Sequence, residues 1–135
     1  MNRRDFQELA QVRLNEDKVL LDAGHFDGAC YLPGYAVECA LKACIARLTF
    51  EGDFPDRRRV DDSYTHDFGR LVRAAELEGE LRTAMLADQL FALNWSRVMD
   101  WHESKRYERI AEEEATGQAK SDQSSGVMGW LQLYL

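Results

Sequence analysis

Four residues with hydrogen-bonding side chains recur in one stretch of the chain at the spacing of a helix face. Tyr31, Tyr35, Glu38 and Lys42 follow one another at intervals of four, three and four residues, so on an α-helix their side chains are neighbours. Glu38 precedes Lys42 by four residues, which is the favourable order for an ion pair within a helix. Two phenols beside an ion pair have the chemistry of a binding surface. We expect this face to meet a second copy of the chain or to line a ligand cleft.

The histidines and cysteines do not form the pattern of a metal site. They are His25, His66 and His102, and Cys30, Cys39 and Cys44. No H-x-x-H or C-x-x-C pair occurs among them, so we predict no metal ion and reduced cysteines that pack as small apolar side chains. Gly24, Gly28 and Gly34 lack the spacing of a phosphate-binding loop, and no cofactor is predicted.

The stretch Gly28 to Leu48 must position these groups, and it has the strongest helical period in the chain. Its apolar residues recur at intervals of three and four, which predicts a buried stripe that is rich in alanine and allows close helix packing. Pro33 and Gly34 interrupt the pattern. Because proline cannot donate a backbone hydrogen bond, we expect the helix to start late or to kink there.

The remaining segments also read as helices. Asp5 and Glu8 resemble a capping box that opens a first helix, which extends to about Ala23 and ends at Gly24. The stretch 50–64 has no sustained period and is predicted to be a loop. We expect a third helix capped by Thr65, a fourth from Glu80 to about Trp95, an acidic helix start at 112–114 and an apolar end that docks on the bundle or on a partner. The prediction is one all-α domain over residues 1–135, an antiparallel bundle of four to five helices.

Composition limits the function. The 135 residues carry a net charge of −7, which opposes general nucleic-acid binding because phosphate contacts need a basic surface. The run at 57–59 is basic but is flanked by Asp56, Asp61 and Asp62. We therefore prefer to interpret it as a solvated loop, with an RNA contact as the second interpretation. No apolar run is long enough to span a membrane and the first residues lack the apolar core of a signal peptide. We expect a cytoplasmic protein with no membrane partner.

Three segments resemble the HEPN-domain family (higher eukaryote and prokaryote nucleotide-binding domains), in particular its small stand-alone bacterial and archaeal type. The first, A-x-Y-L-x-G-Y-A-x-E-x-A-L-K-A, is supplied by Ala29, Tyr31, Leu32, Gly34, Tyr35, Ala36, Glu38, Ala40, Leu41, Lys42 and Ala43. The second is the T-H-D-F-x-x-L run from Thr65 to Leu71. The third is similar to the family's N-W-x-x-V-x-x-W-x-x-E-x-R-Y-E run, through Asn94, Trp95, Val98, Trp101, Arg106, Tyr107 and Glu108, with Ser104 in place of the glutamate.

The resemblance implies an all-α fold, a homodimer and a possible nucleotide ligand. It also implies an accessory role beside a nucleotidyltransferase-type protein partner, as in toxin–antitoxin modules, with Tyr31, Tyr35, Glu38, Lys42, Arg106 and Tyr107 as the ligand or dimer face. In this interpretation the protein is non-catalytic, and Arg106 forms an ion pair with Glu108 or Glu38. His66 anchors its loop to the bundle.

The alternative is a metal-independent ribonuclease, because catalytic members of the family carry an arginine and a histidine four to six residues apart. Arg97 and His102 have that spacing, and a homodimer brings two such pairs into one cleft. Histidine can exchange the proton of the RNA 2′-hydroxyl or of the leaving oxygen, and the arginine fork suits the phosphate. Val98 and Ser104 depart from the active pattern. In the nuclease His102 must face the dimer cleft near Arg97, whereas in the accessory module His102 is exposed and Trp101 is buried.

Overall fold

The computed structural model describes residues 1–54, 56–122 and 126–135, and within them the chain is helical with no strand. The elements, in order, are α1 (Arg3–Asp22), α2 (Phe26–Arg47), α3 (Arg57–Ser63), α4 (Phe68–Ala74), α5 (Glu78–Ala87), α6 (Gln89–Met99), the 3₁₀ helix η1 (Glu103–Tyr107), α7 (Glu112–Asp122) and α8 (Val127–Leu131). The all-α prediction is confirmed. The described residues form more and shorter helices than the predicted four or five.

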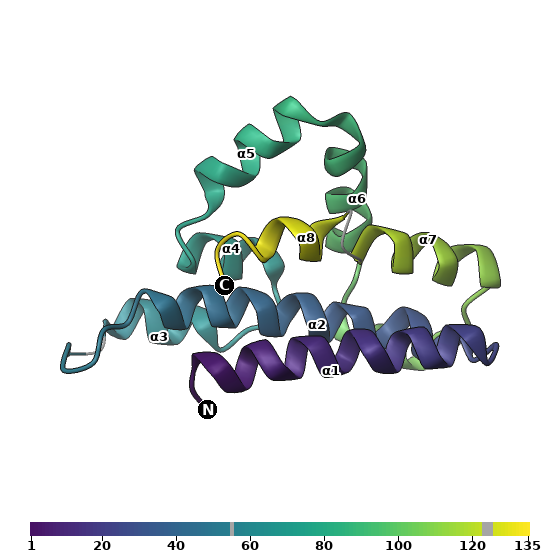
Figure 1. The fold of residues 1–135 in the computed structure, drawn as a ribbon, viewed down its shortest axis with the longest axis horizontal. Coiled ribbons are helices and arrows are strands. Elements are labelled where there is room, and N and C mark those ends of the chain that lie inside the picture. The colour runs from purple at the N-terminus through teal and green to yellow at the C-terminus, as the bar shows by residue number, and fades with distance from the viewer. Residues whose placement is uncertain (55, 123–125) are drawn as a thin grey trace.

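The two longest helices, α1 and α2, lie antiparallel along the base of the molecule (Figure 1). Their connection is short because Gly24, with a φ of 78°, ends α1. The His25 N–H donates to Leu20 O and the Gly24 N–H to Leu21 O, which is the two-bond ending that glycine favours. The predicted stop at Gly24 is therefore correct. The capping box is one turn earlier than predicted, between Asn2 and Asp5.

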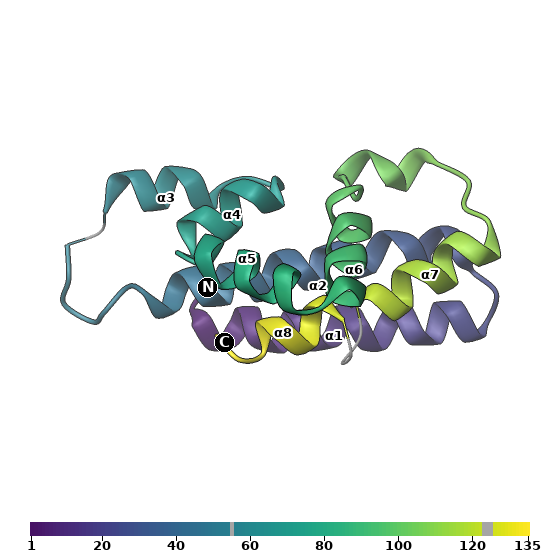
Figure 2. The same ribbon diagram turned by 90° about the horizontal axis from the view of Figure 1, so that it is seen from above.

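The other helices surround α2. Viewed from above, α3, α4 and η1 lie on one side of α2 and α1 on the other, while α7 and α8 run along its length (Figure 2). The pair α5–α6 rises away from this base (Figure 1). The buried core contains the alanine-rich stripe of α2 together with apolar residues of α4, α6 and α8, among them Val37, Leu41, Leu71, Trp95, Val98 and Leu131.

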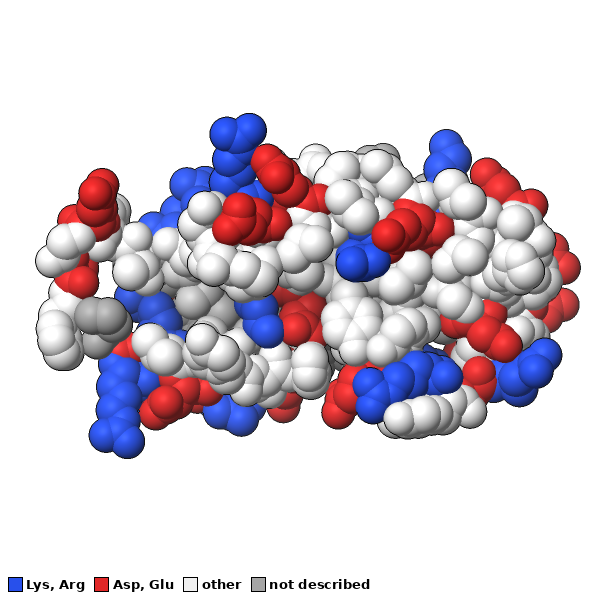
Figure 3. All heavy atoms as spheres, turned by 90° about the horizontal axis from the view of Figure 1, so that it is seen from below, with Lys and Arg blue, Asp and Glu red and all other residues white. Residues whose placement is uncertain are grey.

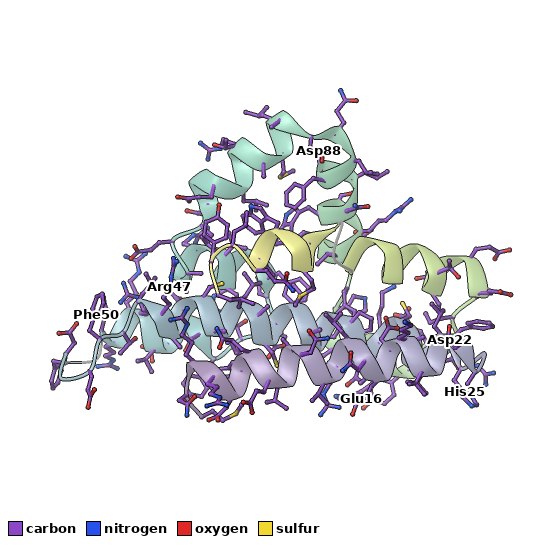
Figure 4. The ribbon with its side chains drawn as sticks, viewed as in Figure 1. Glu16, Asp22, His25, Arg47, Phe50 and Asp88 are labelled. Atoms are coloured by element: carbon purple, nitrogen blue, oxygen red, sulfur yellow. The ribbon has the colours of Figure 1, made fainter. Side chains whose placement is uncertain are left out.

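Several local predictions of helix boundaries are wrong. The helix predicted from Glu80 to Trp95 is broken at Asp88, whose carboxylate accepts hydrogen bonds from the N–H groups of Leu90 and Phe91 and so begins α6. Figure 4 labels Asp88 at this corner, where α5 turns into α6. The loop predicted at 50–64 contains α3, which Asp56 caps in the same way.

The second helix does not start late at its proline, and a kink there stays a prediction. α2 is continuous from Phe26, with Pro33 inside it and buried. α4 is capped by Asp67 in place of the predicted Thr65, whose hydroxyl instead accepts from the Asp67 N–H. As predicted, α7 begins at the acidic run of 112–114, and α8 docks on the bundle, where Trp130 packs against Phe91 and Trp95.

The burial of the cysteine side chains agrees with the packing role predicted for them. Cys30 and Cys44 are buried and Cys39 is partly buried, and all three are thiols outside any disulfide. Burial raises the pKa of the Cys44 thiol to about 11 and also raises the pKa of Cys39. No three histidine, cysteine or carboxylate side chains of the described residues gather as a metal site would require. None of the helices in the described part of the chain is long and apolar enough to cross a membrane.

Candidate functional site

The polar face of α2 is covered by other parts of the chain, and Glu38 is its centre. The Glu38 side chain is buried, with the residue only 5% exposed. Its Oε1 accepts from Lys42 Nζ at 2.8 Å, and its Oε2 lies 2.7 Å from Nδ1 of His66. The predicted ion pair with Lys42 therefore forms, and a second partner comes from the segment before α4. A buried carboxylate with a partner on each oxygen holds both side chains in a fixed orientation.

The two tyrosines of this face form a hydrogen-bonded pair against a tryptophan. The hydroxyls of Tyr31 and Tyr35 are 2.8 Å apart. The Trp101 indole N–H donates to Tyr31 O at 3.1 Å, and its ring packs edge-on against Tyr35 and stacks on Phe68. Burial, followed by the hydrogen bond to Tyr31, raises the pKa of Tyr35 to about 12. The Tyr35 phenol therefore stays protonated at neutral pH and acts as a hydrogen-bonding group.

Gly34 explains how the tryptophan reaches α2. A Cβ atom placed on Gly34 would lie 2.0 Å from Cε2 of Trp101, closer than any real contact. Only a glycine leaves space for the indole at this point, since its backbone carries no side chain. The glycine and the tryptophan, both in the segments that resemble the HEPN family, form one contact although they are far apart in the sequence.

The contact predicted for Arg106 differs from the observed one. No ion pair joins Arg106 to Glu38 or Glu108 among the described residues. A hydrogen bond to the Tyr31 hydroxyl, with a further one to Tyr107, raises the pKa of Arg106, and its guanidinium lies 4.8 Å from the centre of the Tyr107 ring. Arg106 thus lies near the Tyr31 hydroxyl, and both Arg106 and Tyr107 are exposed at the surface.

Arg97 and His102 are not joined by a hydrogen bond or ion pair in the described part of the chain. Arg97 is exposed in the last turn of α6. His102 Nδ1 hydrogen-bonds Ser104 Oγ, and its Nε2 is 3.8 Å from a carboxylate oxygen of Glu108. The His102 side chain is half exposed, whereas Trp101 is only 4% exposed. In a single chain this exposure agrees with both interpretations, because a histidine that faces a dimer cleft is also exposed in the monomer. Pairing of Arg97 and His102 across a homodimer stays a prediction.

Two histidines meet at one open hollow, which the sequence did not predict. The hollow has a volume of about 600 Å³ and lies between the segment before α4 and the segment between α6 and η1. It is lined by Tyr64, Thr65, His66, Asp67, Phe68, Met99, Trp101, His102 and Glu103. The side chains of His66 and His102 are each about half exposed. Since Glu38 occupies Nδ1 of His66, the ring nitrogen that remains for a ligand is Nε2.

The surface around the site has mixed charge. Figure 3 shows basic and acidic side chains interspersed over the face that α1, α2 and α3 share, without a continuous basic stripe. Lys42 and His66 contact Glu38, and Asp67 and Glu103 line the same hollow as His66. Such a surface favours a small ligand with few charges over a long nucleic-acid backbone.

Comparison with known proteins identifies the family. The HEPN domain model matches residues 4–122, so the chain belongs to the HEPN-domain family. No curated protein and no solved structure matches the chain. Membership supports a role connected with nucleotides or RNA.

Proposed function

We propose that this HEPN domain is a binding module whose hollow beside His66 and His102 takes a nucleotide or one nucleotide unit of RNA. The observation that carries the proposal is that two half-exposed histidines line the same open hollow, one of them held in place by a buried carboxylate. A volume of about 600 Å³ is within the usual range for small-molecule sites.

The lining supplies a group for each part of a nucleotide. Tyr64 is 85% exposed at the edge of the hollow, so its ring is free to stack on a base. In its protonated form His66 has an Nε2–H that is not used by Glu38 and can donate to a phosphate oxygen, and protonated His102 is a donor of the same kind. The carboxylates of Asp67 and Glu103 accept hydrogen bonds from sugar hydroxyls or base amino groups.

The proposal is tested by titrating the protein with AMP and with a short RNA oligomer by isothermal calorimetry. We expect saturable binding that weakens about tenfold in His66→Gln and in His102→Gln, because each loses a charge-assisted contact to phosphate. His25→Gln is the matched control, since His25 lies in the turn between α1 and α2 and outside this lining. Equal binding by all three variants, or none by the parent protein, contradicts the proposal.

The accessory role includes partners. We propose a cytoplasmic homodimer that works with a nucleotidyltransferase-type protein, as in toxin–antitoxin modules. The face of α2 that we predicted as a dimer face is largely covered, because Trp101 and His66 pack over its tyrosines and Glu38. We therefore place a dimer contact on the exposed part of this face, at Arg106 and Tyr107. Light scattering after size exclusion at micromolar concentration measures the mass, and a monomer would contradict this part.

The ribonuclease alternative has one observation in its favour, which is that His102 is half exposed at an open hollow. It requires metal-free cleavage of RNA that is lost in Arg97→Ala and in His102→Ala while both variants remain folded. If the parent protein does not cleave RNA, or if the variants cleave equally well, the arginine and histidine are not a catalytic pair.

A further inference from the structure

A second hollow lies on the other side of Tyr64. It has a volume of about 610 Å³ and is bounded by the start of α1, the second half of α2 and α3. Its lining consists of Met1, Phe6, Lys42, Ile45, Ala46, Thr49, Asp56, Arg59, Val60, Ser63 and Tyr64. Figure 3 shows the depression between α1 and α3, with basic atoms at its edge.

The hollow exists because α3 does not pack closely on α2. No residue of α3 is buried. Its one aliphatic residue, Val60, lines the hollow and is 41% exposed. Phe6 and Ile45 form the facing apolar wall, where Ile45 is almost fully buried. Apolar walls on both sides of an open space favour a flat apolar group between them.

The same lining holds two cations that their partners keep in position. Lys42 Nζ uses one of its donors for Glu38 at 2.8 Å. The Arg59 guanidinium donates to Leu48 O at 3.3 Å and to Glu76 at 2.9 Å. Both groups have further N–H donors, since an ammonium has three and a guanidinium has five.

The acidic side chain in the lining, that of Asp56, has a structural role as a helix cap. One carboxylate oxygen of Asp56 accepts from the backbone N–H groups of Arg58 and Arg59 and so caps α3. Thr49 and Ser63 add neutral hydroxyls. With two cations and a single acid that already caps α3, the lining is suited to an anion, which contrasts with the mixed lining of the neighbouring histidine site.

We propose that this hollow is a second binding site, for a small ligand that joins a flat aromatic group to one anionic substituent. The aromatic group lies between Phe6 and Val60, and the anion meets Lys42 and Arg59. A free aromatic acid and a nucleotide share this chemistry. The site is separate from the histidine hollow, because among the described residues only Tyr64 lines both.

The test uses 1-naphthoate as the probe in calorimetric titrations of the full chain. We expect saturable binding of one probe per chain, and loss of about tenfold or more in affinity in Val60→Trp, whose indole fills the hollow. Val12→Trp is the matched control, because Val12 is also a helix valine, is 44% exposed and lies outside the lining. Circular dichroism shows that both variants are folded.

Charge recognition is tested with Arg59→Gln and with the neutral analogue 1-naphthamide. Arg59→Gln should weaken naphthoate by about tenfold and leave naphthamide unchanged, because only the anion uses the guanidinium. If AMP displaces naphthoate, the natural ligand is a nucleotide. If AMP does not displace naphthoate, the natural ligand is a free aromatic acid. The proposal is overturned if no saturable binding occurs, if Val60→Trp binds like the parent protein, or if Val12→Trp loses binding equally. His102→Gln, which lies outside this lining, should keep naphthoate binding, so a failure of the nucleotide site is distinguished from a failure of the second site.

Discussion

The buried carboxyl of Asp17 gives a stability that depends on pH. Asp17 lies in α1, is fully buried, and neither of its carboxylate oxygens has a hydrogen-bond partner among the described residues. Burial raises the pKa of this carboxyl from 3.8 to about 6, since the charged form loses its hydration. Between these two pH values the folded state binds more protons than the unfolded state, so stability falls as pH rises through this window and stays reduced above it.

The magnitude follows from the two pKa values. Raising the pKa of this carboxyl from 3.8 to about 6 destabilises the folded state by about 3 kcal/mol at neutral pH, relative to acid pH. Roughly half of this difference develops between pH 5 and pH 8. Asp17→Asn cannot ionise and lacks the effect. We therefore expect the free energy of unfolding of Asp17→Asn, minus that of the parent protein, to increase by roughly 1.5 kcal/mol from pH 5 to pH 8.

The assay is urea unfolding followed by tryptophan fluorescence and circular dichroism, at one protein concentration and several pH values. Asp22→Asn is the matched control, because Asp22 is on the same helix and exposed, and its difference from the parent should not change in this way with pH. A difference for Asp17→Asn that is constant from pH 5 to pH 8 would refute the reasoning, since it would show that the carboxyl has the same proton affinity in both states.

Three further predictions test local parts of the structure. Gly34→Ala should destabilise the fold by about 2–4 kcal/mol in urea unfolding and shift the Trp101 fluorescence, because the new methyl group overlaps the indole; unchanged emission and stability would show that Trp101 does not lie against Gly34. Asp88→Ala should lower stability by about 1 kcal/mol through loss of the α6 cap, whereas Asp88→Asn should retain most of it. The Cys44 thiol, with its pKa raised to about 11, should resist iodoacetamide at pH 8 and react after unfolding, and fast labelling of Cys44 in the native protein would contradict its burial.

The helical class and the main helix were predictable because they depend on local spacing. The three-and-four period of 28–48 determines which side of α2 is buried, and Gly24 supplies the positive φ that ends α1. The Glu38–Lys42 pair is likewise set by a separation of four residues. The HEPN resemblance, which depends on residue types at fixed positions, is confirmed by the match over residues 4–122.

Breaks between short helices were harder to predict. The apolar period continues from α5 into α6, so the sequence favours one helix, yet the Asp88 cap changes the chain direction between them. Asp56 starts α3 by the same device inside a segment dense in charge. In both places one capping carboxylate, through its hydrogen bonds to two backbone N–H groups, outweighs a weak periodic signal.

The sequence alone therefore determined the helical fold, its central helix with two distinct faces, and the family. Only the tertiary structure decided the site, because its contacts join residues that are distant in the chain. His66 meets Glu38, and Trp101 meets Gly34 and Tyr31, through packing of α4 and the η1 segment against α2. Local spacing encodes which groups share a helix face, whereas the partners that cover this face, and the hollows left beside them, depend on how whole helices pack.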